Sequence, residues 1–316
     1  MPELLAFGEC MVELFSDQSI AEARTFTKTC GGDSCNAAVA AARLGTSTGY
    51  LTRVGDDPFA PFLLHAWGIY GLDTSHCLPV PGFNGLYIIS LQPDGEREFT
   101  YYRKGSAAST SEPSDLDEAY IASARWLHVT GISQAISPTC RQTALAALSI
   151  AKRHGLRTSF DPNLRPALWS VAEAREAMEE VLPLIDVVLP SMPGETAAMI
   201  GLTDPHEVAE YFLARGPSLV VGKRGSDGCI MTTREGSQTV DAHPPERVVD
   251  TSGAGDAFTG AFIHGMLTTD DPRIAARLAV ITASLKLRGR GALESQPSRN
   301  EVYGAYERQY GNVTGG

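Results

Sequence analysis

The chain has 316 residues, of which 43% are hydrophobic, enough for a substantial core in one large α/β domain or two small ones. Its formal net charge of −11 disfavours nucleic acid and anionic membranes as partners, because both bind clustered lysines and arginines. The N-terminal sequence has no basic leader and no apolar run is long enough to cross a bilayer, so we expect a soluble, cytoplasmic protein. No Cys-x-x-Cys pair occurs, so we expect the cysteines to be free thiols.

The first predicted element is a buried strand at residues 4–7, which is followed by Gly8 and Glu9. In a parallel sheet the carboxyl end of such a strand opens on a ligand site, and this would place Glu9 at the mouth of that site. A solvated carboxylate in a strand-to-loop turn is an equally good interpretation of Glu9.

A glycine pair, Gly31 and Gly32, precedes an alanine-rich helix. Two glycines in this position let a ligand approach the backbone, and Asn36 in the first turn would direct its amide toward the same space. Asp33 or Ser34 is the expected N-cap of the helix. By itself the motif could also be an ordinary loop that leads into a helix.

Residues 85–91 and 97–103 alternate in polarity around a Pro-Asp-Gly turn and predict a hairpin. The alternation places Tyr87 on one face of the first strand, and Tyr101 with Arg103 on one face of the return strand. An amphipathic hairpin outside the main α/β alternation indicates a lid. The alternative is a surface aromatic cluster with a solvated arginine.

Strands and helices alternate regularly between residues 126 and 189, so we expect right-handed crossovers and a mostly parallel sheet. One of these strands runs into Asp161-Pro-Asn-Leu-Arg165, which brings Arg165 to the ligand edge of the sheet. Arg103 and Arg165 together would suit a sugar with a carboxylate, because a guanidinium group binds a carboxylate through two hydrogen bonds. Arg165 could equally be a surface residue paired with Asp161.

Two further segments carry charged residues near predicted strand ends. A buried strand leads into Lys223-Arg-Gly225-x-x-Gly228, which by itself is a hairpin turn with two exposed cations. Glu195 lies at the start of an earlier helix, where the helix dipole favours a carboxylate.

The most restrictive motif is Asp-Thr-Ser-Gly-Ala-Gly-Asp at residues 250–256. Gly253, Ala254 and Gly255 allow successive N–H groups to converge on one point. The helix that starts near Asp256 adds its positive end, so the turn predicts an anion hole. Asp256 would accept the proton of a hydroxyl group that attacks a bound phosphate, and its ordinary acidity would keep it ionised at neutral pH. A plain helix N-cap is the simpler alternative.

This motif resembles the second signature of the ribokinase-like (PfkB-type) carbohydrate kinases. The first signature of that family, Gly-Gly followed by Asn and an alanine-rich helix, is reproduced by the glycine pair, Asn36 and Leu44-Gly45. The resemblance extends over almost the whole chain. It implies a single domain over residues 1–316 with a three-layer α/β/α fold and a mostly parallel sheet. It also implies a small β-lid, formed by parts of about 10–30 and 84–105.

The resemblance implies a role for each matching residue. In the family the last aspartate of the second signature is the catalytic base and the glycine turn is the anion hole, which implies these roles for Asp256 and for Gly253, Ala254 and Gly255. The residues implied in sugar binding are Gly31, Gly32, Asn36, Tyr87, Tyr101, Arg103, Arg165 and Asp256. Those implied in ATP binding are Lys223, Gly225, Gly228, Gly253 and Gly255. Glu195 is implied in ordering Mg²⁺ through water, although this chain has Ser191 where the family usually has asparagine.

Among the subgroups, Tyr87, Tyr-Tyr-Arg103, Gly131-Ile-Ser and Asp161-Pro-Asn-Leu-Arg165 are similar to the 2-keto-3-deoxygluconate kinases. The implied reaction transfers the γ-phosphoryl group of ATP to the terminal hydroxyl group of 2-keto-3-deoxygluconate and gives 2-keto-3-deoxy-6-phosphogluconate. ATP and Mg²⁺ are the implied cofactors, K⁺ or another monovalent cation is a further candidate, and self-association through the lid is expected. A kinase of a neutral sugar, of the fructokinase or ribokinase type, is the main alternative.

Two other classes are less consistent with the motifs. An NAD-dependent dehydrogenase would need a small residue where Phe258 stands, and its glycine turn would lie in the first βα unit of the chain. A non-catalytic sugar sensor on a kinase scaffold would not need the intact Asp256.

Overall fold

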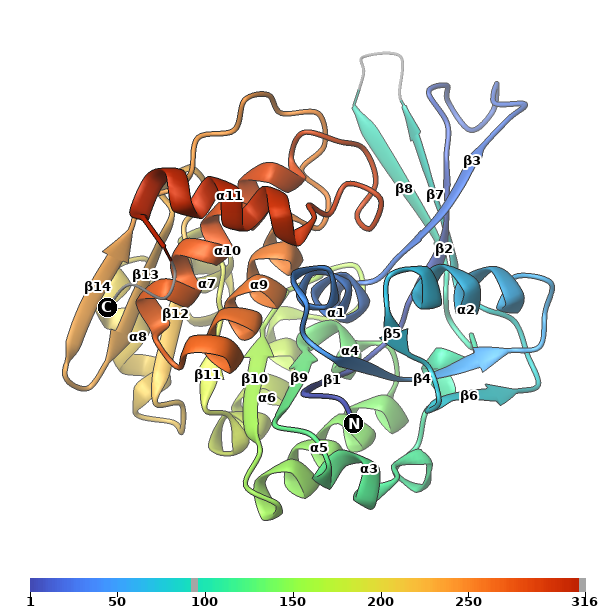
Figure 1. Cartoon of the computed structure of the whole chain (residues 1–316). Coiled ribbons are helices and arrows are strands. Elements are labelled where there is room, and N and C mark those ends of the chain that lie inside the picture. The colour runs from blue at the N-terminus through green and yellow to red at the C-terminus, as the bar shows by residue number, and fades with distance from the viewer. Residues whose placement is uncertain (92–95, 313–316) are drawn as a thin grey trace.

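Mostly buried strands form a central sheet in the computed structural model of the chain, which describes residues 1–91 and 96–312 (Figure 1). In spatial order these strands are β14 (Gly236–Val240), β13 (Cys229–Thr233), β12 (Leu219–Lys223), β11 (Val187–Val188), β10 (Arg157–Asp161), β9 (Trp126–Thr130), β1 (Leu4–Phe7), β4 (Thr48–Gly55) and β5 (Leu72–Asp73), and β6 (Cys77–Val80) also pairs with β4. The strands from β12 to β5 pair in parallel, and only β13 and β14 are antiparallel within the part that the structure describes.

Helices cover both faces of the central sheet, as the alternation of strands and helices predicted (Figure 1). One layer contains α1 (Asp33–Leu44), α2 (Ala60–Ile69), α9 (Ala254–Thr269), α10 (Pro272–Lys286) and α11 (Arg299–Tyr310). The other contains α3 (Glu118–Ala122), α4 (Gly131–Ala135), α5 (Pro138–Arg153), α6 (Val171–Val181), α7 (Gly194–Ile200) and α8 (Pro205–Leu213).

The side chains of β1 show how the sheet holds these layers. Leu5 and Phe7 belong to the core beneath α5 and α6, whereas Leu4 belongs to the core beneath α9 and α10. Successive residues of a strand point to opposite faces, so a strand buried on both faces needs a continuous apolar run. The short apolar run at residues 4–7 therefore identifies a central strand, and β1 does lie between β4 and β9.

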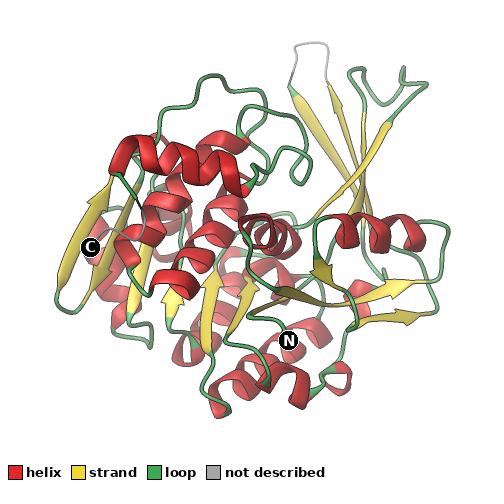
Figure 2. Cartoon of the chain, viewed as in Figure 1, coloured by secondary structure: helices red, strands yellow, loops and turns green. Residues whose placement is uncertain are grey.

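A second, four-stranded sheet stands apart from the helical layers (Figure 2). Its order is β3 (Thr27–Gly31), β2 (Met11–Phe15), β7 (Leu86–Leu91) and β8 (Arg97–Tyr102), and we call it the small sheet. The β7–β8 pair is the predicted hairpin, with Tyr87 opposite Tyr101. Its Pro-Asp-Gly turn lies outside the described residues.

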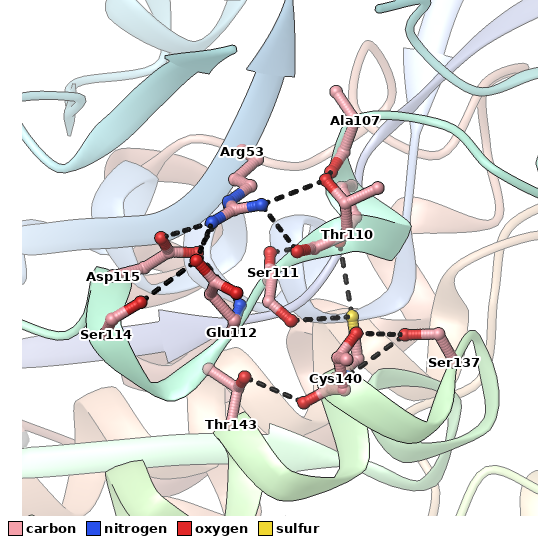
Figure 3. Close-up of polar contacts among 12 residues, drawn as sticks. Arg53, Ala107, Thr110, Ser111, Glu112, Ser114, Asp115, Ser137, Cys140 and Thr143 are labelled. Atoms are coloured by element: carbon pink, nitrogen blue, oxygen red, sulfur yellow. Dashed lines mark hydrogen bonds and ion pairs between the residues drawn. The ribbon is translucent and has the colours of Figure 1, made fainter.

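Arg53 of β4 binds the segment that follows the small sheet, at Thr110 and Asp115 (Figure 3). The Arg53 guanidinium donates to the Asp115 carboxylate at 2.7 and 2.6 Å and to the carbonyl oxygen of Thr110 at 2.6 Å. The thiol of Cys140 in α5 also donates to the carbonyl oxygen of Ala108 at 3.3 Å. These contacts fix the segment that follows Arg103, and so they anchor the end of β8 to the large sheet.

Helix α1 begins earlier than the sequence suggested. Its N-cap is Gly32, no side chain caps it, and Asp33 is already the first helical residue. The expected cap at Asp33 or Ser34 is therefore wrong. The Asp33 carboxylate instead accepts a hydrogen bond from Asn163 Nδ2 at 3.0 Å. Among the described residues, no helix is long and apolar enough to cross a membrane.

Candidate active site

Two cavities meet at the carboxyl ends of the parallel strands, where open α/β sheets bind ligands. One, of ≈ 470 Å³, is polar and reaches from Asp161 to Asp256, and the other, of ≈ 410 Å³, is mainly apolar. Both are lined by Lys223 and by the turn at Ala254 and Gly255. The glycine turn thus forms the boundary between an apolar compartment and a polar one.

The glycine turn has the geometry of an anion hole. Gly253 is the N-cap of α9 and adopts the left-handed conformation (φ 73°), which disfavours a side chain. Within the described part of the chain, the N–H groups of Gly253, Gly255 and Asp256 meet no protein acceptor, whereas that of Ala254 donates to the Thr251 carbonyl oxygen at 3.2 Å. Two of the three amides expected to bind an anion are thus open at a helix N-terminus, and that of Ala254 is engaged with backbone.

Asp256 lies in the first turn of α9, directly beside this hole. Its Oδ2 accepts a hydrogen bond from Asn36 Nδ2 at 2.8 Å, which brings the two signature motifs together. Burial and the nearby carboxylate of Asp33 raise the pKa of Asp256 to about 7, although the Asn36 hydrogen bond acts in the opposite direction. The expectation that ordinary acidity keeps Asp256 fully ionised at neutral pH is therefore wrong. A pKa near the working pH is the better property for a general base.

The polar cavity contains further carboxylates. Burial raises the pKa of Asp33, and burial together with Asp161 raises that of Glu195. Lys223, at the end of β12, forms a buried ion pair with Asp161 at the end of β10. Asp161 is therefore paired with Lys223, and the alternative in which it pairs with Arg165 is not observed. Thr259 of α9 also donates to Asp161, at 3.2 Å.

The residues of this cavity fit a Mg²⁺ ion that is held mainly by phosphate and water. No group of three or more histidine, cysteine or acidic side chains could enclose a metal among the described residues, which agrees with the usual way Mg²⁺ binds beside phosphates. Asp161 Oδ1 is buried and has no partner in the described part of the chain, so it is free to accept a hydrogen bond from a ligand or from cation-bound water. Glu195 accepts the N–H groups of Leu164 at 2.7 Å and Ser191 at 2.8 Å, one on each carboxylate oxygen. Glu195 therefore also holds these two loops in place.

Arg103 and Arg165 approach the same side of the site. Burial and the neighbouring charge of Arg165 lower the pKa of Arg103 to about 10. Arg103 forms an ion pair with Glu9, whose side chain is only 2% exposed. Arg165 donates to the carbonyl oxygen of Leu164 at 3.0 Å. Arg165 lines the polar cavity, and Glu9 is buried against Arg103 rather than solvated.

The aromatic residues of the small sheet face the glycine pair. Tyr87 is buried, donates its hydroxyl proton to Glu13, and stacks on Tyr101 with ring centroids 5.7 Å apart. A Cβ atom on Gly31 would lie 2.7 Å from the Tyr87 hydroxyl group, and one on Gly32 would collide with the backbone of Glu9. A side chain at Gly31 would displace the Tyr87 hydroxyl group, and one at Gly32 would meet the backbone of the segment that follows β1, so close packing favours glycine at both positions.

The apolar cavity lies beyond Lys223, between the β12–β13 turn and α10. Gly225 and Gly228 both line it, and both have positive φ angles, of 57° and 77°. Ser284 of α10 also lines it, and the buried hydroxyl group of Ser284 has no partner among the described residues. An apolar slot with a few polar groups, adjoining an anion hole, has the composition expected of a nucleotide-base site.

Sequence reasoning missed two residues of this site. From the sequence, Asp33 is expected only as a helix cap, and Asp161 only as part of the motif that ends at Arg165 and as an alternative partner of Arg165. The available signal for Asp161 was its place directly at the end of a buried parallel strand, where carboxylates meet a ligand. For Asp33 the signal was weaker, because a first-turn aspartate is common in helices.

An anion hole beside a carboxylate, at the ligand edge of a parallel sheet, is the arrangement of a phosphoryl-transfer enzyme. A model of the pfkB family of carbohydrate kinases matches residues 1–299, and the chain belongs to this family. The predicted fold class and family are thereby confirmed.

Similar proteins include 2-dehydro-3-deoxygluconokinases of Thermoproteus tenax (35% identical, covering 96% of this chain and 93% of the relative) and Bacillus subtilis (31%, covering 95% and 94%). A probable fructokinase-7 of Arabidopsis thaliana is 32% identical and covers 95% of this chain and 91% of the relative. Among solved structures, a putative ribokinase II of E. coli in complex with ATP and Mg²⁺ has a TM-score of 0.89 at 26% identity, covering 98% of this chain and all of that one.

Proposed function

We propose that the chain transfers the γ-phosphoryl group of ATP to the terminal hydroxyl group of 2-keto-3-deoxygluconate and so forms 2-keto-3-deoxy-6-phosphogluconate. The observation that carries this proposal is Asp256 beside the open anion hole, with Arg165 lining the same polar cavity and Arg103 close enough to Arg165 to feel its charge. The names of the two 2-dehydro-3-deoxygluconokinase relatives support the substrate.

Asp256 acts as the general base. The substrate oxygen forms a bond to the γ-phosphorus while the bond between that phosphorus and the bridging oxygen breaks, and ADP leaves with the electron pair. The proton of the attacking hydroxyl group passes to the Asp256 carboxylate, and the N–H groups of Gly253 and Gly255 hold the charge on the transferred group. Asn36 keeps the carboxylate aimed into the site through its 2.8 Å hydrogen bond.

The nucleotide occupies the two cavities that share the glycine turn. The apolar cavity receives the adenine, with Gly225 and Gly228 at its wall, and Lys223 lies where the phosphates pass into the polar cavity. Mg²⁺, which neutralises phosphate charge when bound, would be held by water on Asp161, with Glu195 as a more distant support. The similar E. coli structure, which is a complex with ATP and Mg²⁺, supports ATP and Mg²⁺ as the ligands.

The substrate carboxylate is bound by Arg103 and Arg165. A charge-assisted pair of this kind contributes about 1.5–3 kcal/mol per hydrogen bond when water is excluded. Glu9 competes for Arg103 and prevents two bare guanidinium groups from facing each other before the sugar acid binds. A neutral sugar would offer Arg165 no carboxylate, which disfavours the fructokinase alternative.

The decisive experiment is ADP release with MgATP over a panel of keto-deoxy acids, aldonates, fructose and ribose. We expect kcat/KM for 2-keto-3-deoxygluconate to exceed that for fructose by at least about 100-fold, since the lost charge pairs are worth several kcal/mol. A higher value for fructose or ribose would replace this proposal with a neutral-sugar kinase. Turnover in EDTA would contradict the Mg²⁺ assignment.

The small sheet is proposed to act as a lid and as a surface for self-association. Exposed aromatic residues lie on it, including Phe99 (43% exposed) and Tyr102 (55%). Exposed apolar clusters of this kind are typical of protein–protein contacts. Light scattering on the wild type and on Tyr102→Ser tests this proposal, because a monomeric wild type would contradict it.

A cytoplasmic location fits the six buried free cysteines.

A further inference from the structure

Lys286, the last residue of α10, is a fully buried cation that the reaction described above does not use. An unpaired buried ammonium group costs several kcal/mol, and lysine side chains normally extend to reach water. Its Nζ instead donates to the backbone carbonyl oxygen of Asp250 at 3.0 Å and lies 3.8 Å from Asp250 Oδ2. A lysine in the last turn of a helix is ordinarily explained by the helix dipole, but this one contacts a different segment.

Asp250 joins three segments that are distant in the sequence. Its Oδ1 accepts from Arg97 of the small sheet at 2.7 Å and from the N–H group of Ser252 at 2.9 Å. Its Oδ2 accepts from the N–H group of Gly291 at 2.9 Å. The small sheet, the turn before α9 and the loop after α10 therefore converge on one carboxylate, with Lys286 against its backbone carbonyl.

The charges around Lys286 favour its ammonium form. The N–H group of Ser252, Arg97 and Lys286 outweigh burial and lower the pKa of Asp250 to about 2, so this carboxylate is ionised. Burial lowers the pKa of Lys286, but Asp250, Asp256 and Glu13 act in the opposite direction, and Arg97 is the other cation that faces it. The pKa of Lys286 is lowered overall, and its ammonium group lies 3.8 Å from Asp250 Oδ2, within ion-pair distance.

We propose that Lys286 is a positioning residue whose ammonium group fixes the turn from Asp250 to Gly253. The fixed turn directs its open N–H groups at the transferred phosphoryl group. No soluble monovalent cation is needed for this. Gly253 follows Asp250 by three residues, so a small rotation at Asp250 would redirect the amides of the hole. A displacement of about 1 Å in a catalytic group lowers the rate about 100-fold. The kinetic part of this inference rests on the proposed function.

Chemical rescue tests the inference directly. The rate of ADP release is compared in potassium, sodium, ammonium and tetramethylammonium chloride at constant ionic strength. We expect the wild type to have the same kcat within about twofold in all four salts. Lys286→Ala should lose about 100-fold in kcat in tetramethylammonium, with little change in KM for ATP, and should regain activity in ammonium or methylammonium. Lys152→Ala, which removes a half-exposed lysine of α5, is the control and should behave like the wild type.

A measurement without substrate separates this inference from the proposed function. Hydrogen exchange is compared in the wild type and in Lys286→Met, which keeps the apolar stem of the side chain, at the amides of Ser252 and Ala254, which donate to acceptors within the turn. We expect exchange at these amides to accelerate at least about tenfold in the variant, because the turn loses its anchor. Ammonium, but not tetramethylammonium, should restore slow exchange in Lys286→Ala.

Three results would overturn the inference. One is a wild type that needs potassium for turnover, and another is a folded Lys286→Met variant with wild-type kcat. The third is unchanged amide exchange in Lys286→Met, which counts against the inference whatever the substrate. If Lys286→Ala does not fold, Lys286→Met decides the outcome through its thermal unfolding and its exchange.

Discussion

Asn36 Nδ2 donates to Asp256 Oδ2 at 2.8 Å, although 220 positions separate these residues in the chain. The contact joins the first turn of α1 to the first turn of α9. Both helices have glycine N-caps, Gly32 and Gly253. The proposed base and the residue proposed to orient it are thus supplied by two helices, which favours precise placement.

Replacement of the base tests its role. We expect Asp256→Asn to lower kcat by at least about 1,000-fold, because a general base contributes about 10²–10⁴-fold and the amide cannot accept the proton. The dissociation constant for MgATP, measured by calorimetry, should change little. Turnover near the wild-type rate would remove Asp256 from the mechanism.

The same variant should be more stable than the wild type. The pKa of Asp256 is raised to about 7 in the folded chain, so the folded state binds more protons than the unfolded state below that pH. Stability from this group is therefore lost as the pH rises through about 7. We expect Asp256→Asn to raise the free energy of unfolding by about 1–2 kcal/mol at pH 8, a value discounted for solvent screening. Urea unfolding at pH 5 is the control, because the difference should shrink there.

The pH profile gives a second, independent check on Asp256. A carboxylate base works only when it is deprotonated, so kcat/KM should rise with pH and level off above about 7. The Asn36 hydrogen bond lowers this pKa, and Asn36→Ala should therefore move the midpoint to higher pH. A midpoint that stays fixed in Asn36→Ala would mean that another group is being titrated.

The two arginines should control affinity for the acid. We expect Arg165→Ala to raise KM for the sugar acid by about 10- to 100-fold with little effect on KM for ATP, since each lost charge-assisted hydrogen bond is worth about 1.5–3 kcal/mol. Arg165→Lys is the matched variant and should recover part of the loss. Equal effects on both Michaelis constants would place Arg165 outside the sugar pocket.

Much of the fold could be predicted because its signals are local. The run at residues 4–7, the glycine closing α1 and the alternation along β7 and β8 each follow from neighbouring residues. The edge strand β14 gave no such signal, because four of its five residues are exposed. It forms through its pairing with β13, which the local pattern does not contain.

The site was predictable where one motif supplies the chemistry and less so where distant segments combine. Residues 253–256 carry their own backbone geometry. The raised pKa of Asp256 depends on Asp33 and Asp161, and the ion pair of Lys223 with Asp161 links the ends of two strands. Such electrostatic effects depend on distances across the fold, which only the tertiary structure defines.

Two neighbouring glycines of the turn should respond differently to the same change. Gly253 has a φ of 73°, and a Cβ atom there would lie 3.1 Å from Ala292 Cβ, whereas one on Gly255 would meet only Lys223 Nζ, at 3.7 Å. We expect Gly253→Ala to lower the free energy of unfolding by about 1–2 kcal/mol, because a non-glycine residue in the left-handed region costs this much. Gly255→Ala should leave unfolding unchanged and weaken MgATP binding, because its methyl group would enter the nucleotide cleft. Unfolding curves and calorimetric titration of both variants check this contrast, and equal destabilisation of the two would show that the turn is not held in the conformation described.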